Sequence, residues 1–352
     1  LYSSAASDVY KRQVIDIYYK RITAERNFID YSLFVSYFPL LVAGPIERAT
    51  HLLPQVKIKR QFNFEKAKEG VYQIIWGLVK KVVIADSCAT YANAVFDHYE
   101  SMNSLSLILG AIYFAFQIYG DFSGYSDIAL GTSKLFGIDL LKNFNYPYFS
   151  RDIAEFWRRW HISLSSWFRD YLYIPLGGSQ GGMWMKVRNT FVIFLVSGFW
   201  HGANWTFIIW GLLNAIYFLP LLLQNKNRSN MGEIEMNWNI SSVKTILNIL
   251  GTFALTTVAW IFFRAKSISE AMGYIQKMVT DWHFNSQYLS NQRYNFELLL
   301  LVLIFVLVEW FNRSKVEPLS GKASWIKVAV ALLALLALGV YSDYKEFIYF
   351  QF

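Results

Sequence analysis

Cysteine is almost absent from this sequence, which has a single one, Cys88, among 352 residues. One thiol cannot form an intramolecular disulfide, and its isolation excludes a metal site rich in cysteine. The stretch IADSCATYA (84–92) includes no cation that would activate the thiol, so we expect Cys88 to be a small buried residue. The five histidines form no HExxH motif or other ligand spacing, and no catalytic metal is predicted.

Charged residues are also scarce, at 16%, whereas 55% of the residues are hydrophobic and 18% are aromatic. Soluble domains carry about 25% charged residues, so this composition indicates a membrane protein. Apolar windows recur at 104–119, 189–223, 245–263, 297–311 and 326–341, and a further window, 71–96, is interrupted by Lys80 and Lys81. Several approach the roughly 20 residues that a membrane-spanning helix needs. We predict an all-α polytopic protein with six or seven crossings, some of them bent, re-entrant or tilted.

Acidic residues are fewer than basic ones, which gives a net charge of +8. The basic residues gather in short stretches between apolar windows, at 57–60, 80–81, 151–169 and 186–188. Such loop charge is the positive-inside pattern, and it favours contact with anionic lipid. We therefore expect the lipid bilayer, and not nucleic acid, as the partner, and a multi-pass location in the inner (cytoplasmic) membrane.

An initiator methionine is missing, and LYSSAASDVYKRQ (1–13) resembles translated adapter sequence. We expect these residues not to be native, and we leave them out of the fold prediction. The remaining residues, 14–352, are predicted to form one membrane domain that is incomplete at its N-terminus. No internal repeat or second soluble domain is found.

Two polar segments follow the 104–119 window. Residues 120–150 contain four glycines and one proline, and irregular backbone at membrane depth survives only around a cavity or inside protein, so this segment is expected to line something. Asp121 and Asp127 within it are expected to form turns or helix caps, because nothing supports a catalytic carboxylate pair. Residues 151–178 predict one amphipathic helix at the membrane interface, with His161 at the margin of its aromatic face.

The stretch SGFWHGANWTFIIW (197–210) places His201 inside an apolar window. A lone histidine in a soluble core is usually structural, but an ionisable group in hydrocarbon is costly and by default marks a functional site. Gly198 and Gly202 weaken the helix there and allow another backbone or a substrate to approach. A neutral imidazole at this position could act as a general base. Asn204 could donate to an oxyanion, or equally well cap the helix that follows.

His161 is the second candidate for a catalytic histidine. Trp157 and Trp160 would disfavour its charged form by desolvation, and Arg158 and Arg159 would lower its pKa further. On residue chemistry alone, a histidine that only anchors a surface helix explains the position as well. GxSxG, Walker A and GxGxxG motifs are all missing, which argues against an α/β-hydrolase and a nucleotide-driven pump.

Several stretches together resemble the membrane-bound O-acyltransferase (MBOAT) superfamily, in particular its bacterial branch of alginate O-acetyltransferases and related acetylation proteins. The matching stretches are LLVAGPIER (40–48), DFSGYSDIALG (121–131), NFNYPYFSRDIAEFWRRWHISLSSWFRDYLYIPLGG (143–178), SGFWHGANWTFIIWG (197–211), AWIFFRA (259–265) and EFIYFQF (346–352). The resemblance implies a ring of membrane helices, with re-entrant and interfacial ones, around a central tunnel. It also implies that His201 and His161 are catalytic. Residues expected to bind or orient substrate are Asn204, Trp200, Trp160, Arg158, Asp121 and Tyr125.

The resemblance implies transfer of an acyl group, expected to be acetyl, to hydroxyls of an extracytoplasmic polysaccharide such as alginate. The donor is expected to be a cytoplasmic thioester such as acetyl-CoA, used as co-substrate with no bound cofactor, and the partner a periplasmic or extracellular SGNH-type acetyltransferase. One alternative is D-alanyl transfer from a carrier protein to teichoic acid, which GANWTFIIWG fits less well. Another class is a transporter or flippase, which would show inverted repeats and intramembrane charge pairs. The sequence shows neither.

Overall fold

The computed structural model describes residues 15–234, 240–283, 295–315, 318–341 and 347–348. Within these ranges the chain forms helices joined by loops, and no strand. The predicted artefact at residues 1–13 lies outside them. The α-helices are α2 (Phe28–Val35), α3 (Ala49–Lys57), α4 (Phe64–Leu78), α5 (Asp86–Asp97), α6 (Ser104–Leu135), α7 (Ile153–Arg159), α8 (Ile162–Phe168), α9 (Gly182–His201), α10 (Trp205–Leu223), α11 (Ile240–Arg264), α12 (Ile268–Thr280), α13 (Asn295–Asn312) and α14 (Ser324–Leu338). The all-α membrane fold is confirmed.

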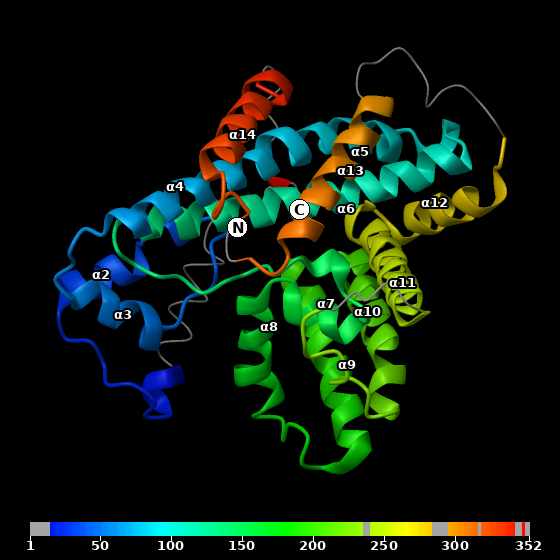
Figure 1. Ribbon diagram of the computed structural model, residues 1–352. Helices are drawn as coiled ribbons and strands as arrows, with labels where there is room; N and C mark the ends of the chain where they lie inside the picture. The colour runs from blue at the N-terminus through cyan, green and yellow to red at the C-terminus, as the bar shows by residue number, and fades with distance from the viewer. Residues whose placement is uncertain (1–14, 235–239, 284–294, 316–317, 342–346, 349–352) are drawn as a thin grey trace.

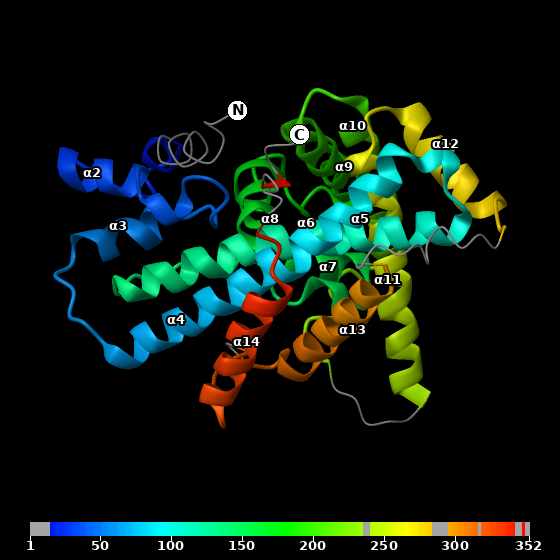
Figure 2. The same cartoon turned by 90° about the horizontal axis from the view of Figure 1, so that it is seen from above.

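The long helix α6 organises the molecule. It lies along α4 and α5, while α7, α8, α9 and α10 form a second group on one side of it (Figure 1). Both α13 and α14 contact the π-helical segment η2 (Val79–Ala85), which joins α4 to α5, and α2 and α3 lie at one end of the α4–α6 pair (Figure 2). Most of the hydrophobic core surrounds α6.

Three helices are long and apolar enough to cross a membrane: α6, α10 and the 242–264 part of α11. Two shorter apolar helices, 298–312 of α13 and α14, accompany them. The described residues thus contain fewer full-length spans than the six or seven crossings expected from the sequence. The central tunnel stays a prediction.

The prediction that residues 120–150 line something is confirmed, since the segment contributes Asp127, Leu130 and the loop 140–146 to the wall of a cavity. Its first half is nevertheless regular, because α6 continues without interruption to Leu135. Its glycines serve helix packing instead of breaking the helix. A Cβ on Gly124 would lie 2.7 Å from the carbonyl oxygen of Gly77, and one on Gly131 would lie 2.4 Å from that of Gly70. Small residues therefore let α4 and α6 approach closely, as in many membrane helix pairs.

The lysine pair that interrupts the 71–96 window does not form a loop. Lys80 is buried within η2, where its Nζ lies 3.0 Å from Asp127 and 3.4 Å from Glu309. Lys81 lies 2.8 Å from Asp121. Both aspartates are therefore ion-paired residues inside α6, and the prediction that they form turns or caps is wrong. Charge pairs between helices, which were not found in the sequence, are therefore present, because the partners come from segments far apart in the chain.

The prediction that 151–178 forms a single helix is also wrong, whereas its place at the membrane interface stays a prediction. The segment divides into α7, α8 and the π-helical turn η5 (Arg169–Tyr173). The break falls at Trp160 and His161, which are only 3% and 5% exposed, and His161 has a left-handed backbone with φ 45°. Phe156, Trp160 and Phe168 are buried, whereas Trp157, Trp167 and Tyr171 are partly exposed.

The helices α9 and α10 form a hairpin with a three-residue link, 202–204. Gly198 and Gly211 are its contact points: a Cβ at these positions would lie 2.3 Å from the carbonyl oxygens of Phe207 and Phe194. Gly198 therefore allows the backbone of α10 to approach α9 close to His201. The sequence analysis predicted the approach of either a backbone or a substrate. The hairpin places His201 at the end of α9 that meets the start of α10.

Candidate active site

His161 is held by Asn143, a residue that the sequence analysis did not select. The imidazole Nδ1 lies 3.1 Å from Asn143 Oδ1, which also accepts from the backbone N–H of Ser163 at 3.2 Å and from its hydroxyl at 2.9 Å. Asn143 Nδ2 donates to Ser126 Oγ at 3.3 Å. Because an amide oxygen only accepts, His161 carries its proton on Nδ1, and Nε2 is the basic nitrogen.

The surroundings of His161 keep its imidazole neutral. The ring packs edge-on against Phe122, with centroids 4.6 Å apart, and it lies in a loop outside the candidate membrane spans. Burial lowers the pKa of His161 well below its ordinary value, and repulsion by His201, when His201 is protonated, lowers it further. A neutral imidazole is the form that can accept a proton.

His201 lies in a ring of aromatic side chains from three helices. Its imidazole centroid is 4.9 Å from Trp200, 5.2 Å from Trp210 and 5.0 Å from Phe263. The side chain is half-buried, and the link that follows it is exposed at Ala203 and Asn204. A small substrate could thus reach His201 while aromatic rings exclude bulk water from its other side.

Aromatic rings connect the two histidines. Trp160 is adjacent to His161 in the sequence, and its ring centroid lies 5.1 Å from that of Trp260. The ring centroid of Trp260 lies 5.8 Å from that of Trp210, which packs against His201. The helix α11 contributes Trp260, which the sequence analysis placed in an apolar window and in a stretch of family resemblance but did not select for the site. Tertiary packing therefore brings the two predicted histidines into one apolar region.

A cavity of about 230 Å³ lies between the elements that carry the histidines. Leu164 and Ser165, on the first turn of α8 after His161, line one side of it. Ser197, one turn before His201 on α9, and Trp157 also line it. Neither histidine lines the cavity, which therefore lies beside the candidate site and not within it.

The remaining predicted residues serve different parts of the structure. Asn204 caps α10, since its Oδ1 accepts from Thr206 N at 3.1 Å, and its Nδ2 donates to the carbonyl oxygen of Lys266 at 3.0 Å. The capping alternative is therefore confirmed, and the orienting role stays a prediction. Asp121 accepts from the backbone N–H of Ile348 at 2.6 Å. Tyr125 lies 5.6 Å from the ring of Phe347.

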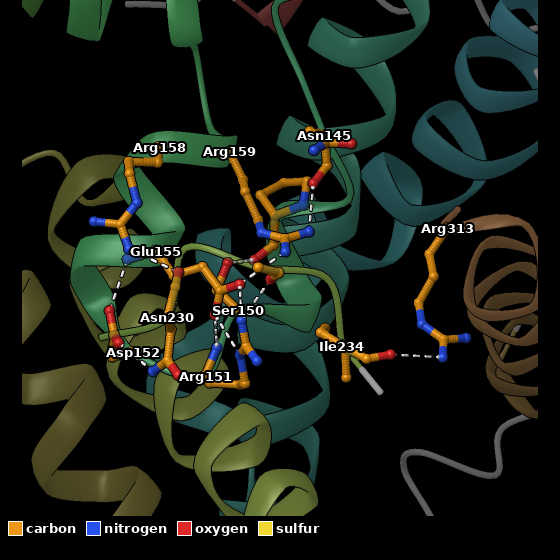
Figure 3. A network of polar contacts seen from close by, with 12 residues as sticks. Asn145, Ser150, Arg151, Asp152, Glu155, Arg158, Arg159, Asn230, Ile234 and Arg313 are labelled. Carbon is orange, nitrogen blue, oxygen red and sulfur yellow. Dashed lines mark hydrogen bonds and ion pairs between the residues drawn. The ribbon is translucent and has the colours of Figure 1, made fainter. Parts of the chain in front are cut away.

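Arg158 belongs to a network that fastens the loop after α10 to α7 (Figure 3). It donates to the carbonyl oxygens of Asn227 at 2.8 Å and Asn230 at 3.0 Å. Beside it, Glu155 pairs with Arg151 at 2.9 Å and Arg159 at 2.7 Å. Burial would raise the pKa of Glu155, but the two guanidinium groups outweigh burial and lower it. The guanidinium of Arg158 thus donates to the loop after α10. Its predicted contact with substrate stays a prediction.

The sequence analysis missed Asn143 and the buried pair of Lys80 and Glu309. A polar residue amid the apolar stretches of NFNYPYF (143–149) was a signal for the first. The glutamate at 309 interrupts an apolar window and was a signal for the second. The described residues hold no cluster of three or more potential metal ligands. Cys88 is fully buried, as expected.

The fold and the site together define a polytopic membrane protein whose interior carries two histidines in aromatic surroundings. Residues 19–232 match the sequence model of the MBOAT, membrane-bound O-acyltransferase family, and the chain belongs to that family. The match confirms the resemblance found in the sequence.

Individual relatives have related names. A peptidoglycan O-acetyltransferase of Helicobacter pylori is 37% identical over 93% of this chain and 65% of its own length. A probable alginate O-acetylase of Pseudomonas aeruginosa is 37% identical over 88% of this chain and 58% of its own length. A teichoic acid D-alanyltransferase of Bacillus subtilis is 29% identical over 66% of this chain and 60% of its own length. The chain thus spans about three fifths of the length of these relatives.

Proposed function

We propose that this protein transfers an acetyl group from a thioester donor, such as acetyl-CoA, to hydroxyls of an extracytoplasmic polysaccharide such as alginate or peptidoglycan. The observation that carries the proposal is the packing of His161 and His201 into one aromatic region, from elements 40 residues apart in sequence. The similarity to an alginate O-acetylase and a peptidoglycan O-acetyltransferase supports the acetyl group and the polymer.

In the proposed reaction His201 acts as the general base. Its imidazole takes the proton of the acceptor hydroxyl while the hydroxyl oxygen attacks the thioester carbonyl. The carbon–sulfur bond of the tetrahedral intermediate then breaks, the new ester forms, and the thiolate takes the proton back. No net proton is released. His161, with Nε2 as its basic nitrogen, assists the donor, and Asn143 is a positioning residue that holds the imidazole.

The smaller cavity supports a donor path to this site. Leu164, Phe168, Ile193 and Phe194 give it apolar walls, while hydroxyls of Ser165 and Ser197 and the side chains of Arg169 and Arg228 add polar groups. Such a lining suits a narrow thioester arm, which is apolar along its chain and polar at its amides. We further propose a location in the inner membrane and an SGNH-type acetyltransferase as partner, since the positive-inside pattern and the family resemblance favour them.

The proposal is tested by replacing the base. His201→Ala in the full-length protein is expected to reduce polymer O-acetylation by about 10²- to 10⁴-fold, the contribution of a general base. Ester-linked acetate on the purified polymer is the measurement. The matched control is His98→Ala, since His98 is exposed on the loop after α5. Acetylation that is undiminished in His201→Ala would falsify the assignment.

D-alanyl transfer to teichoic acid is the second candidate, because the Bacillus subtilis relative carries that name. The lower identity of that relative disfavours it for this chain. The choice of donor distinguishes the two reactions. Membranes that contain the protein would acetylate polymer when given acetyl-CoA if the first proposal holds, and would D-alanylate polymer only when given a charged carrier protein if the second holds.

A transporter or flippase is the alternative from a different class. The buried pairs of Lys80 with Asp127 and Glu309 are a feature expected of that class. Membership of an acyltransferase family disfavours it. The pairs also have a structural explanation, since they connect η2 to α6 and α13.

A further inference from the structure

A second and larger cavity, of about 680 Å³, lies on the other side of α7. It shares no lining residue with the cavity near the histidines. Its walls are α4, the C-terminal part of α6, the loop 140–146, the loop 231–234 and the chain that leaves α13. Arg313, after α13, donates to the carbonyl oxygen of Ile234 across this space, with Arg159 and Asn145 on the opposite side (Figure 3). We call it the basic cavity.

The basic cavity has a marked excess of positive charge. Its lining includes six cationic side chains against two acidic ones. The cations are Lys80, Lys134, Lys142, Arg159, Arg313 and Lys315, and the acids are Asp127 and Glu233. Lys80 is paired with Asp127 and Glu309, and Arg159 is paired with Glu155, so the excess rests on Lys134, Lys142, Arg313 and Lys315 against Glu233. The lining therefore favours an anionic ligand.

The basic cavity lies where a helix with an exposed apolar face ends, since Arg313, Ser314 and Lys315 line it directly after α13. Leu300, Leu303, Leu307 and Phe311 repeat at helical spacing along one face of α13, and each is at least half exposed. The helix stops at Asn312, and Arg313 and Lys315 follow immediately. A change from exposed apolar to basic residues is typical of the membrane interface.

We propose that the basic cavity binds the phosphate headgroup of an anionic phospholipid whose acyl chains lie along the exposed face of α13. Basic pockets between membrane helices recognise such headgroups. The apolar face holds the chains and the cationic lining holds the phosphate, so both parts of one lipid are accounted for. The inference goes beyond the proposed acyl transfer and does not depend on it. A phosphate could also come from a free anion or from coenzyme A, and the experiment separates these sources.

The test compares lipids on the purified protein in detergent micelles. Native mass spectrometry with dioleoylphosphatidylglycerol is expected to show tighter retention than with dioleoylphosphatidylcholine. The double variant Lys142→Gln/Lys315→Gln should weaken phosphatidylglycerol binding roughly 10- to 30-fold, from about 1 kcal/mol for each lysine near the headgroup. The matched control is Lys59→Gln/Lys68→Gln, because these lysines are exposed and lie outside the cavity.

Lys142→Arg/Lys315→Arg keeps the charge and should retain the lipid, which separates lost charge from lost folding. The proposal is overturned by equal retention of the two lipids, or by equal weakening in the control pair. Coenzyme A that displaces phosphatidylglycerol at equimolar concentration would assign the cavity to the donor. Inorganic phosphate that does so at millimolar concentration would assign it to free anions. Either displacement overturns the lipid assignment.

Discussion

At the scale of single residues, Asn143 Oδ1 lies 3.1 Å from Nδ1 of His161 and leaves Nε2 as the basic nitrogen of that imidazole. His201 stands out because an ionisable side chain in an apolar window is costly. Asn143 does not, because asparagine before a proline-containing stretch also suits a turn. Its importance comes from a contact with His161, 18 positions later. That contact fixes which imidazole nitrogen is basic.

Changing Asn143 to aspartate tests this arrangement through pH. The variant Asn143→Asp keeps an acceptor for Nδ1–H but adds a negative charge, which opposes burial and raises the pKa of His161. Protonation then begins at higher pH, so the acidic limb of the pH–activity profile for polymer acetylation should move to higher pH. Activity at alkaline pH should be largely kept. An unmoved acidic limb would show that His161 does not take part in the reaction as a base.

The control for that experiment is Asn63→Asp. Asn63 caps α4 through its side-chain oxygen, which accepts from Lys66 N at 3.0 Å. Aspartate caps helices equally well. The control therefore introduces the same charge far from the histidines, and its pH profile should match that of the unchanged protein.

At the scale of elements, glycine has two opposite roles that the sequence does not separate. The glycines of 120–131 suggested irregular backbone, yet they lie within an uninterrupted α6. Glycine weakens an isolated helix, but it also allows two helices to approach when another backbone faces it. Which effect dominates depends on the partner, α4, which lies more than 40 residues earlier in the sequence. The prediction of a site at His201 did not depend on the role of glycine, because it rested on an ionisable side chain in an apolar window.

Substitution of a packed glycine tests this role. A Cβ at Gly131 would lie 2.4 Å from the carbonyl oxygen of Gly70, so Gly131→Ala should destabilise the protein by about 1–3 kcal/mol through overpacking. The control is Gly251→Ala on α11, where nothing lies within 4 Å of the added carbon, and a gain of about 0.5–1 kcal/mol is expected. Unfolding temperatures in detergent measure both. Equal effects of the two substitutions would contradict the close packing of α4 and α6.

At the scale of the whole molecule, buried charges connect segments from distant parts of the chain. Lys80 in η2 contacts Asp127 of α6 and Glu309 of α13, and Tyr119 donates to Glu309 at 2.8 Å. A charge in a low-dielectric interior is stable only when its partners are in place. The cluster therefore joins α13 to the α4–α6 layer.

Lys80→Met should remove this connection. It leaves the buried carboxylate of Glu309 and the partly exposed one of Asp127 without their cation, at a cost of about 3–5 kcal/mol. Lys266→Met is the control, since its pair with Asp97 is largely exposed and should contribute less than about 1 kcal/mol. Thermal unfolding and protease accessibility of α13 are the measurements. A Lys80→Met protein as stable as the control would show that the cluster does not hold α13.

The sequence by itself determined the membrane class, the family and the two histidines. These follow from composition and from short motifs, which can be recognised without knowing which residues pack against them. Only the tertiary structure decided that 151–178 breaks at His161, that Lys80 is buried and paired, and that Asn143 holds the imidazole. Each of these depends on a group far away in the chain. Burial makes such contacts strong, because a polar group removed from water must find its partner within the protein.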